Sequence, residues 1–406
     1  MPKSAAPDAL EAHNRSSGRT AGIQFRFKPQ GKEVALSTSS SRDRPDQGPT
    51  MIVVGRPDHH DNPRRRQSPA RRRLARRWFR AVSAMAAALL LTGCDGPQSV
   101  LAPSSEDARL MALLSWWFFG AGALILAVTL GLLVIALSLA WRGGQSRPIS
   151  FRASMVLVVS GGVVAPALAV VAVTYTGVMI GDETEGADGR SATAPTVEVD
   201  GRMWWWEFRY LDKNGAVIAV TANELHLPVG ERARLRLTSD NVIHSFWVPN
   251  LQGKTDLIPG KDNVLYAQPA VSGVWRGQCA EFCGMQHALM GFVVVAQPRP
   301  AYETWVADQA ADAAVTSGPG LDAFLKNGCG VCHAIRGTAA DGQAGPDLTH
   351  LASRATLAAA TLPNTRGNLG GWITSTHEVK PGALMPAIAP EPEELQHLLD
   401  FLGALK

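Results

Sequence analysis

The sequence predicts a multidomain membrane protein in which a two-helix transmembrane hairpin precedes a β-sandwich and a small all-α domain. Two uncharged apolar runs, about 110–140 and about 153–180, each exceed the roughly 20 residues that cross a bilayer. Short segments over 195–298 alternate between apolar and polar side chains, which is the period of half-buried strands. Residues 320–406 end in an apolar stripe at helical spacing. A chain of 406 residues has room for all three parts.

The N-terminal part of the chain divides into a polar extension and an export signal. Residues 1–70 are polar and poor in aromatic side chains, so we expect a disordered extension, which a start at Met51 would shorten. Nine arginines in 64–80 precede an apolar run and a small-residue site, the order of a secretory signal over 71–94. The sequence "LTGC" that ends at Cys94 resembles the lipobox of bacterial lipoproteins and predicts a lipid on that cysteine. An uncleaved membrane anchor is the alternative.

The distribution of charge excludes one class of partner and orients the hairpin, which we place at 95–181. The net charge of +4 derives from the arginine-rich segment, so the rest of the chain is near neutral and no nucleic-acid surface is expected. The loop between the apolar runs has three arginines and no acid, whereas four acids follow the second run. By the positive-inside rule the loop is cytoplasmic and everything after 181 lies outside. The charged residues are Arg142, Arg147, Arg152, Asp182, Glu183, Glu185 and Asp188.

The segment 195–298 is predicted to form the β-sandwich. In "ERARLRLTS", residues 231–239, three arginines alternate with alanine and leucine. Further short strands are separated by Gly, Pro, Asn and Asp, a pattern typical of a sandwich. They are expected at 196–201, 216–222, 263–268 and 291–297. Residues 299–319, which end in small and polar side chains, predict a linker.

Residues 320–406 are predicted to form the small all-α domain. Five leucines at helical spacing follow three glutamates, which the first turn of a helix favours. The leucines are Leu395, Leu398, Leu399, Leu402 and Leu405. A domain of this size is marginally stable on its own, so a bound cofactor is expected to stabilise it.

Four of the five cysteines form two close pairs, each followed by a histidine. Export permits disulfides, so a disulfide in each pair is one interpretation. Cys329, Cys332 and His333 form "CGVCH", the c-type heme attachment signature, in which two thiols bond the heme and the histidine binds its iron. A zinc site would need a second Cys or His pair at suitable spacing, and a thioredoxin-like motif would need a βαβ unit; the sequence offers neither.

The sixth ligand of a heme iron is selected by elimination. Met385 is the only methionine after Met290, and it lies about 50 residues past the heme signature. A methionine paired with a histidine suits electron transfer and raises the reduction potential. Three histidines of the same domain remain as rivals: His350, His377 and His397.

The second cysteine pair lies in "GQCAEFCGMQHALMGF", residues 277–292. This loop carries four side chains that suit copper, namely two thiols, an imidazole and a thioether. They are Cys279, Cys283, His287 and Met290. A blue-copper site needs only one cysteine, so two cysteines indicate either a disulfide or two metals that share bridging sulfurs. A pair of metals needs a second histidine; His244 at the start of a neighbouring strand is available, whereas His226 in "ELHLPVG" is interpreted as a core residue.

Together these motifs resemble subunit II of cytochrome c oxidase with a fused class I cytochrome c. "CAEFCGMQHALM" is similar to that family's binuclear copper loop, and "VIHSFWVPNLQGKTDLIPG" to its upstream histidine segment. "GRMWWWEFRY", residues 201–210, is similar to its aromatic-rich strand, although the family commonly has a Gly-His-Gln-Trp type sequence there. "GPDLTHLASR" and "GGWITSTHEVKPGALMP" resemble the heme-covering segments of class I cytochromes c. The resemblance covers about 110–406.

The resemblance implies a cupredoxin-like sandwich that binds two copper ions. The implied copper ligands are His244, Cys279, Cys283, His287, Met290 and the backbone carbonyl of Glu281. The Glu281 side chain is then free to face the catalytic subunit, where the family has a magnesium ion at the interface. Trp204 matches the family's tryptophan that receives electrons, and a packed core aromatic is the alternative. On one continuous strand, Trp204 and Trp206 would share a face.

The resemblance also implies a function. The chain would be the subunit through which electrons enter a respiratory terminal oxidase, passing from heme c to the copper pair and on to a heme–copper subunit that reduces oxygen to water. Implied partners are subunit I, subunit III and, as donor, a cytochrome c or quinol–cytochrome c reductase. The implied location is the bacterial inner membrane, with both soluble domains on the periplasmic side. Alternatives are the copper A subunit of a nitric oxide reductase and a free-standing membrane-anchored electron-transfer lipoprotein.

Overall fold

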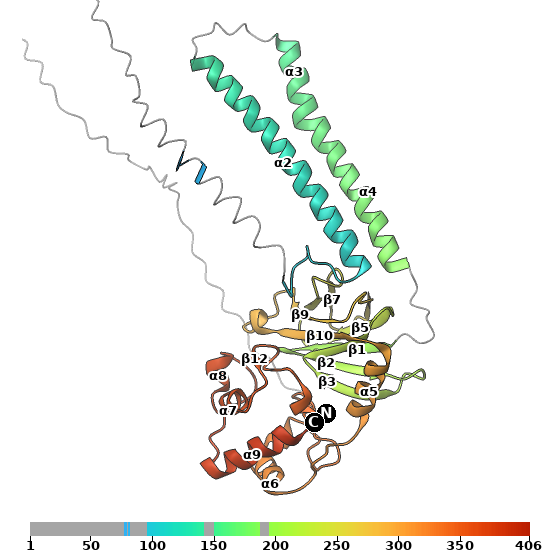
Figure 1. Ribbon diagram of the computed structural model, residues 1–406, viewed down its shortest axis with the longest axis vertical. Helices are drawn as coiled ribbons and strands as arrows, with labels where there is room; N and C mark the ends of the chain where they lie inside the picture. The colour runs from blue at the N-terminus through green and yellow to red at the C-terminus, as the bar shows by residue number, and fades with distance from the viewer. Residues whose placement is uncertain (1–76, 79, 82–95, 142–149, 187–194) are drawn as a thin grey trace, which may run out of the picture. The chain divides into compact units, whose positions relative to one another are not determined.

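The computed structural model of the protein describes residues 77–78, 80–81, 96–141, 150–186 and 195–406 (Figure 1). The expected extension, most of the expected signal and Cys94 lie outside these residues. Along the described part of the chain, two long apolar helical segments are followed by the strands β1–β10 and then by short helices. This order agrees with the predicted fold class.

Two long apolar helical segments precede the strands. Helix α2 spans Glu106–Trp141. The second segment consists of α3 (Phe151–Val159), a π-helical turn (Ser160–Val164) and α4 (Ala165–Gly186). Both segments are long and apolar enough to cross a membrane, and the most apolar window of each is not buried against the rest of the described protein. Such exposed apolar surface is the kind that lipid or partner helices cover.

Helix α2 begins at the surface of the sandwich. Ser105 caps it, because its Oγ accepts a hydrogen bond from the Ala108 amide at 3.0 Å and donates to the carbonyl of Leu251. Just before the helix, Asn250 Nδ2 donates to three backbone carbonyls within residues 96–102. These bonds anchor the start of the first apolar helix to the sandwich.

The sandwich consists of two five-stranded sheets with the orders β3-β2-β1-β5-β8 and β4-β10-β9-β6-β7. In the first sheet β1 pairs antiparallel with β2 and parallel with β5. In the second sheet β10 pairs antiparallel with β9 and parallel with β4. The strands are Thr196–Arg202 (β1), Trp205–Leu211 (β2), Val217–Ala222 (β3), Glu224–Pro228 (β4), Ala233–Ser239 (β5), His244–Trp247 (β6), Thr255–Leu257 (β7), Asn263–Ala267 (β8), Gly273–Cys279 (β9) and Gly291–Gln297 (β10).

An aromatic cluster between the sheets forms the part of the core nearest the predicted copper ligands. Trp206, Phe246 and Phe292 are fully buried, and their ring centroids lie 4.6 to 5.7 Å apart. Aromatic pairs at this spacing contribute about 0.5–1.5 kcal/mol each beyond the burial of their area. The Trp206 ring also lies 6.2 Å from the imidazole of His244, so the cluster supports the strand end that carries this histidine.

The aromatic-rich strand expected at 201–210 is two strands. β1 ends at Arg202 and β2 begins at Trp205, so that Met203 and Trp204 form the turn between them. The alternation along one continuous strand that would have placed Trp204 and Trp206 on the same face therefore does not apply at Trp204. Trp206 is buried in the core, whereas Trp204 is only partly buried at the end of the hairpin.

The first part of the expected linker is a helix. Residues Arg299–Ala310 form α5, which starts with a proline in its first turn, a favoured position. Its Tyr302 is buried in the sandwich core, and Trp305 stacks on His226 with centroids 3.8 Å apart and planes 4° apart. These aromatics, three residues apart on one helix face, draw the segment onto the sandwich. His226 itself is a buried core residue, as expected. Every residue of its strand, β4, is buried.

The C-terminal domain, residues 319–406, is built from short helices. They are α6 (Pro319–Lys326), α7 (Arg366–Thr374), α8 (Thr376–Val379) and α9 (Pro392–Ala404), with 3-10 turns at Cys329–Val331 and Leu351–Ser353 and a small hairpin of β11 (Thr356–Leu357) and β12 (Leu362–Pro363). Of the predicted leucine stripe, four members are buried and Leu395 packs at the edge of the core. Phe324 of α6 packs against Phe401 of α9, with ring centroids 6.2 Å apart.

Candidate functional site

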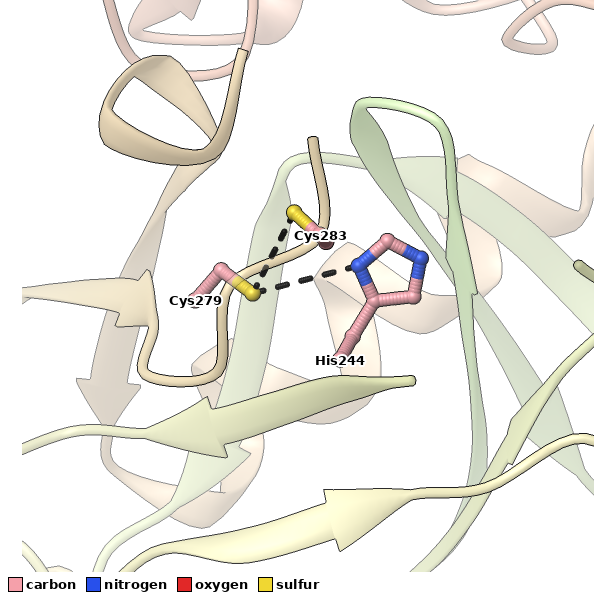
Figure 2. A group of neighbouring side chains, drawn as sticks. All are labelled: His244, Cys279 and Cys283. Atoms are coloured by element: carbon pink, nitrogen blue, oxygen red, sulfur yellow. Dashed lines mark hydrogen bonds between the residues drawn. The ribbon is translucent and has the colours of Figure 1, made fainter. Parts of the chain in front are cut away.

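The structure brings His244, Cys279 and Cys283 together at one end of the sandwich (Figure 2). Cys279 Sγ lies 3.7 Å from Cys283 Sγ and 3.8 Å from His244 Nδ1. All three side chains are buried. Within the described residues this is the single group of three or more His, Cys, Asp and Glu side chains whose ligand atoms lie close enough to hold one metal ion.

The rest of the Cys279–Met290 loop completes the cluster. Cys283 Sγ lies 3.7 Å from His287 Nδ1 and 3.8 Å from Met290 Sδ. Cys279 Sγ lies 3.2 Å from the backbone carbonyl oxygen of Glu281. Each sulfur therefore has an imidazole of its own, and the thioether and the carbonyl lie at opposite sulfurs. Two equivalent sets of donors around a shared pair of sulfurs suit two metal ions better than one.

The two thiols are not joined. Their separation of 3.7 Å is well beyond the roughly 2.05 Å of a disulfide bond, and both cysteines are free. The close approach of the two sulfurs, with a hydrogen bond between them, lowers the pKa of Cys279 and raises that of Cys283. Thiophilic metal ions bind cysteine as the thiolate, so metal binding here would displace the thiol protons.

Backbone hydrogen bonds fix the loop before any metal arrives. The Cys279 amide donates to the Met290 carbonyl at 3.0 Å, and the Ala280 amide donates to the Ser245 carbonyl at 2.9 Å. Gly201 lies against His244, where a Cβ would come within 2.9 Å of the imidazole Cδ2. The absence of that side chain lets the ring lie over β1. The donor atoms are thus preorganised by the strands on both sides.

Trp204 connects the loop to its surroundings. Its indole Nε1 donates to the carbonyl of Cys283 at 2.7 Å. Gly284, with a φ of +109°, leaves room for the ring, because a Cβ there would lie 3.1 Å from Trp204 Cζ2. Trp206 makes a longer bond to the same loop, from Nε1 to the Met290 carbonyl at 3.3 Å. Both tryptophans therefore contact the loop, one from the β1–β2 turn and one from β2.

The side chain of Glu281 points away from the cluster and is exposed. It belongs to no group of metal-binding side chains within the described residues. A magnesium site at Glu281 would therefore need ligands from another chain, which is what the expected interface position implies.

The CGVCH motif borders a cavity of about 320 Å³ in the C-terminal domain. The cavity wall is mostly apolar, and Cys329, Cys332, His333 and Met385 all line it. Volume, apolar lining and a few placed polar groups are typical of a cofactor site. Cys329 and Cys332 are free, and burial raises the pKa of the Cys329 thiol, so it is present as the thiol. The arrangement fits a heme bonded through two thioethers.

His333 is oriented as an iron ligand requires. Its Nδ1 donates to the carbonyl of Pro346 at 2.8 Å, which leaves Nε2 free to bind a metal. Burial lowers the pKa of His333 and favours the neutral imidazole. Gly345 packs against the ring, and a Cβ at this position would lie 2.6 Å from His333 Cε1.

The three rival histidines lie away from this cavity. His350 is buried, but both ring nitrogens are near backbone carbonyls, Nδ1 at 2.8 Å from Lys406 and Nε2 at 3.0 Å from Ala311. His377 is exposed, and His397 lines a different hollow, beside α6. Met385 is the thioether that lines the cavity together with His333. The geometry thus favours the same ligand that elimination selected.

The sandwich contributes to the wall of the cavity in the C-terminal domain. Met203, Trp204 and Trp205, at the β1–β2 turn, line it together with the CGVCH motif. Hydrogen bonds between the two domains hold this arrangement, and most use backbone groups of the C-terminal domain. They are Ala355 N to Glu224 Oε2, Gly291 N to the Ala359 carbonyl, Arg276 Nη1 to the Ala360 carbonyl, Gln286 Nε2 to the Pro381 carbonyl, Arg202 Nη1 to the Gln343 carbonyl and Lys380 Nζ to the Trp204 carbonyl.

Two residues of this interface were missed by sequence reasoning. Lys380 is buried, and burial lowers its pKa to about 8. Glu224 is buried in the sandwich and reaches across to the C-terminal domain. A single lysine or glutamate between Gly- and Pro-rich segments normally predicts a solvated side chain, so the sequence carries no signal for either role.

Comparisons with known proteins identify a family for each of the two parts of the chain that carry these candidate sites. A family model described as the periplasmic domain of cytochrome c oxidase subunit II matches residues 214–297, and a cytochrome c model matches 319–406. Cytochrome c oxidase subunit 2 of Alkalihalophilus pseudofirmus is 35% identical over 215 residues, which cover 52% of this chain and 61% of that protein. The same subunit of Branchiostoma floridae is 31% identical over 159 residues, which cover 35% of this chain and 68% of that protein. This chain belongs to the cytochrome c oxidase subunit II family.

The family match and the cytochrome c match lie side by side along the chain, so the chain is a subunit II with a cytochrome c domain at its C-terminal end. It spans about six tenths of the length of the first relative named above. Among solved structures, the periplasmic domain of subunit II of cytochrome oxidase (CoxB) of Bradyrhizobium japonicum is 28% identical, covering 28% of this chain and 92% of that one, with a TM-score of 0.27.

Proposed function

We propose that this chain is the subunit through which electrons enter a respiratory terminal oxidase. The observation that carries the proposal is the position of Trp204. Its indole N–H is bonded to the carbonyl of Cys283, and the same residue lines the cavity beside the CGVCH motif. One side chain thus touches both candidate cofactor sites. The arrangement is that of a relay rather than of a hydrolytic or acid–base centre.

The residues of the sandwich fit a pair of copper ions. His244, Cys279, Cys283, His287, Met290 and the Glu281 carbonyl would hold them, because soft thiolate, imidazole and thioether donors are those copper prefers. The buried aromatic cluster and the strand ends keep these donors in place and exclude water. Rigid donors suit electron transfer, since little must move when the charge changes.

The residues of the C-terminal domain fit one heme c. Cys329 and Cys332 would bond it, and His333 and Met385 would bind its iron. When bound, the heme and the copper pair would supply the one-electron chemistry that a terminal oxidase needs to reduce oxygen to water. His333 is held by the Pro346 carbonyl, and the apolar wall limits the access of water to the cavity.

The apolar helices support a place in a membrane complex. Helix α2 and the α3–α4 segment would cross the bacterial inner membrane with the two soluble domains on the periplasmic side, and their exposed apolar faces would pack against subunit I and subunit III. A lipid on Cys94 and a magnesium ion at the exposed Glu281 belong to the same proposal. The electron donor would be a cytochrome c or a quinol–cytochrome c reductase.

Electron paramagnetic resonance of the full-length chain, purified with copper and covalent heme, tests the proposal. We expect hyperfine structure from two equivalent coppers that share one unpaired electron, beside a low-spin heme. A signal from one copper only, or no copper and an oxidised Cys279–Cys283 pair, would refute the binuclear site. Co-purification with a heme–copper subunit that reduces oxygen separates this function from a free-standing carrier, and reduction of nitric oxide instead of oxygen would identify the reductase alternative.

A further inference from the structure

Lys380 occupies an unusual place for a lysine. It is the one lysine among the buried side chains of the described residues, with 4% of its surface exposed. An ammonium group in such a place costs free energy unless it is paired or hydrogen-bonded. Its Nζ donates to the carbonyl of Trp204 at 3.2 Å, across the boundary between the C-terminal domain and the sandwich. The bond stabilises that boundary rather than the fold of either domain alone.

The two residues that follow Lys380 also rest on the sandwich. The carbonyl of Pro381 accepts a hydrogen bond from Gln286 Nε2, and the Gln286 side chain is buried directly before the candidate ligand His287. Gly382 has a φ of +85° and lies so close to Met285 that a Cβ would collide with the Sδ atom. Three consecutive residues therefore contact three residues at the Cys279–Met290 loop and its neighbouring turn.

The same segment leads directly to the cavity. Met385 lies three residues after Gly382 and lines the cavity, and Lys380 lines it as well. On the other side, Trp204 bonds to the Cys283 carbonyl through its indole N–H while its own carbonyl accepts from Lys380. Trp204 is thus held at both ends, by the ligand loop of one site and by the ligand segment of the other.

We propose that Lys380 is a positioning residue for electron transfer within this chain, and that Lys380–Gly382 forms a seat that fixes the C-terminal domain on the Cys279–Met290 loop with Trp204 between them. This inference rests on the proposed function. Transfer between two centres falls steeply with their separation, so a seat that fixes the separation sets the rate. A cation suits the seat because its ammonium group donates to the Trp204 carbonyl across the domain boundary.

The test compares Lys380→Met with Lys380→Arg in the full-length chain carrying copper and heme. Lys326→Met is the matched control, because Lys326 lies in the same domain, is exposed and pairs only at the surface with Glu394. Electrons are delivered to the heme by a light flash, and heme oxidation and copper reduction are followed optically. We expect transfer to slow about tenfold in Lys380→Met, which corresponds to ~1.4 kcal/mol, to recover largely in Lys380→Arg, and to be unchanged in the control.

Three further measurements separate positioning from other roles. The heme spectrum, the heme reduction potential and the copper resonance should be the same in all three variants. A shifted heme potential with an unchanged transfer rate would overturn the proposal, since Lys380 would then serve a heme carboxylate instead. Amide hydrogen exchange of the full-length chain carrying copper and heme should rise in Lys380→Met at 283–287 and 380–385, and not in the control.

The experiments test the seat at Lys380–Gly382 and the proposed electron-entry function independently. If electrons do not pass from heme to copper even in the unmodified chain, the proposed function is wrong, and hydrogen exchange still decides whether Lys380 seats the domain. If transfer is normal in Lys380→Met, the seat is refuted and the proposed function stands. Should Lys380→Met fail to fold, Gly382→Ala tests the same seat without a change of charge, and it should slow transfer because its Cβ displaces Met285.

Discussion

Glu224 joins the sandwich to the C-terminal domain, and its replacement by alanine should destabilise their association. One carboxylate oxygen, Oε1, lies 2.9 Å from His226 Nε2, and the other accepts from the Ala355 amide at 2.9 Å. The bond to His226 is buried and the bond to Ala355 is partly buried. Glu224 as a whole residue is only 6% exposed. Glu224→Ala therefore removes two bonds and leaves an imidazole and an amide without their partner.

Only one of these two bonds joins the domains, because His226 lies on the same strand as Glu224. A hydrogen bond to a charged group contributes about 1.5–3 kcal/mol, and relief of the buried carboxylate returns part of that sum. We therefore expect a loss of about 2 kcal/mol in the free energy of unfolding of the C-terminal domain. The assay is denaturant unfolding of the full-length chain, followed by the heme absorption. Glu303→Ala is the control, because its pair with Arg299 is largely exposed on the glutamate side and should contribute less than about 0.5 kcal/mol.

The dependence of folding stability on pH provides a second test of the role of Glu224. Burial alone would raise the pKa of Glu224, but hydrogen bonds with His226 and the Ala355 amide outweigh burial, so the pKa is lowered from 4.5. Its contribution is therefore complete above pH 4.5 and is lost as the pH falls through the lower folded value. Glu224→Gln, which cannot ionise, should lose less stability on acidification than the unmodified chain. Equal losses, or a destabilisation below about 0.5 kcal/mol in Glu224→Ala, would show that Glu224 does not couple the domains.

Three further substitutions probe each site separately. Gly201→Ala would place a Cβ 2.9 Å from the His244 ring, and we expect an altered copper resonance with an unchanged heme spectrum. Gly345→Ala would place a Cβ 2.6 Å from the ring of His333, so covalent heme should fall while copper binding is retained; equal loss of both would argue against separate sites. Met385→Ala should convert the heme to a high-spin form and lower its reduction potential, and a low-spin spectrum in this variant would point to another sixth ligand.

The donor types at both sites could be predicted because they are set by local spacing. Cys279 to Met290 fall within one short loop, and Cys329 to His333 within five residues, so few folds could separate their members. His244 is distant in sequence, and its place beside Cys279 depends on β6 pairing with β9. It could be proposed because the residue types demanded a second imidazole and a strand offered one. Its role as ligand stays a prediction until copper is measured.

The features that the sequence could not give are those that depend on contacts between domains. Trp204 was assigned to a strand because three tryptophans in a row carry no turn signal, yet β1 ends at Arg202 and the chain turns at Met203 and Trp204. Helix α5 was assigned to a linker because its apolar face consists of few side chains, chiefly Tyr302 and Trp305, whose partners lie on distant strands. Lys380 had no signal, since the carbonyl that it meets becomes available only when both domains are folded.

The wall that the β1–β2 turn contributes to the cavity has a consequence for competition among donors. With Trp204 forming part of that wall, the C-terminal domain occupies the surface of the sandwich around this indole. A free cytochrome that docked at the same place would have to displace an occupant whose effective concentration, through a short tether, is about millimolar. Under the proposed function, the fusion would impose a hierarchy: external reductants would deliver electrons to the C-terminal domain, and direct delivery to the sandwich would be suppressed by the chain's own donor.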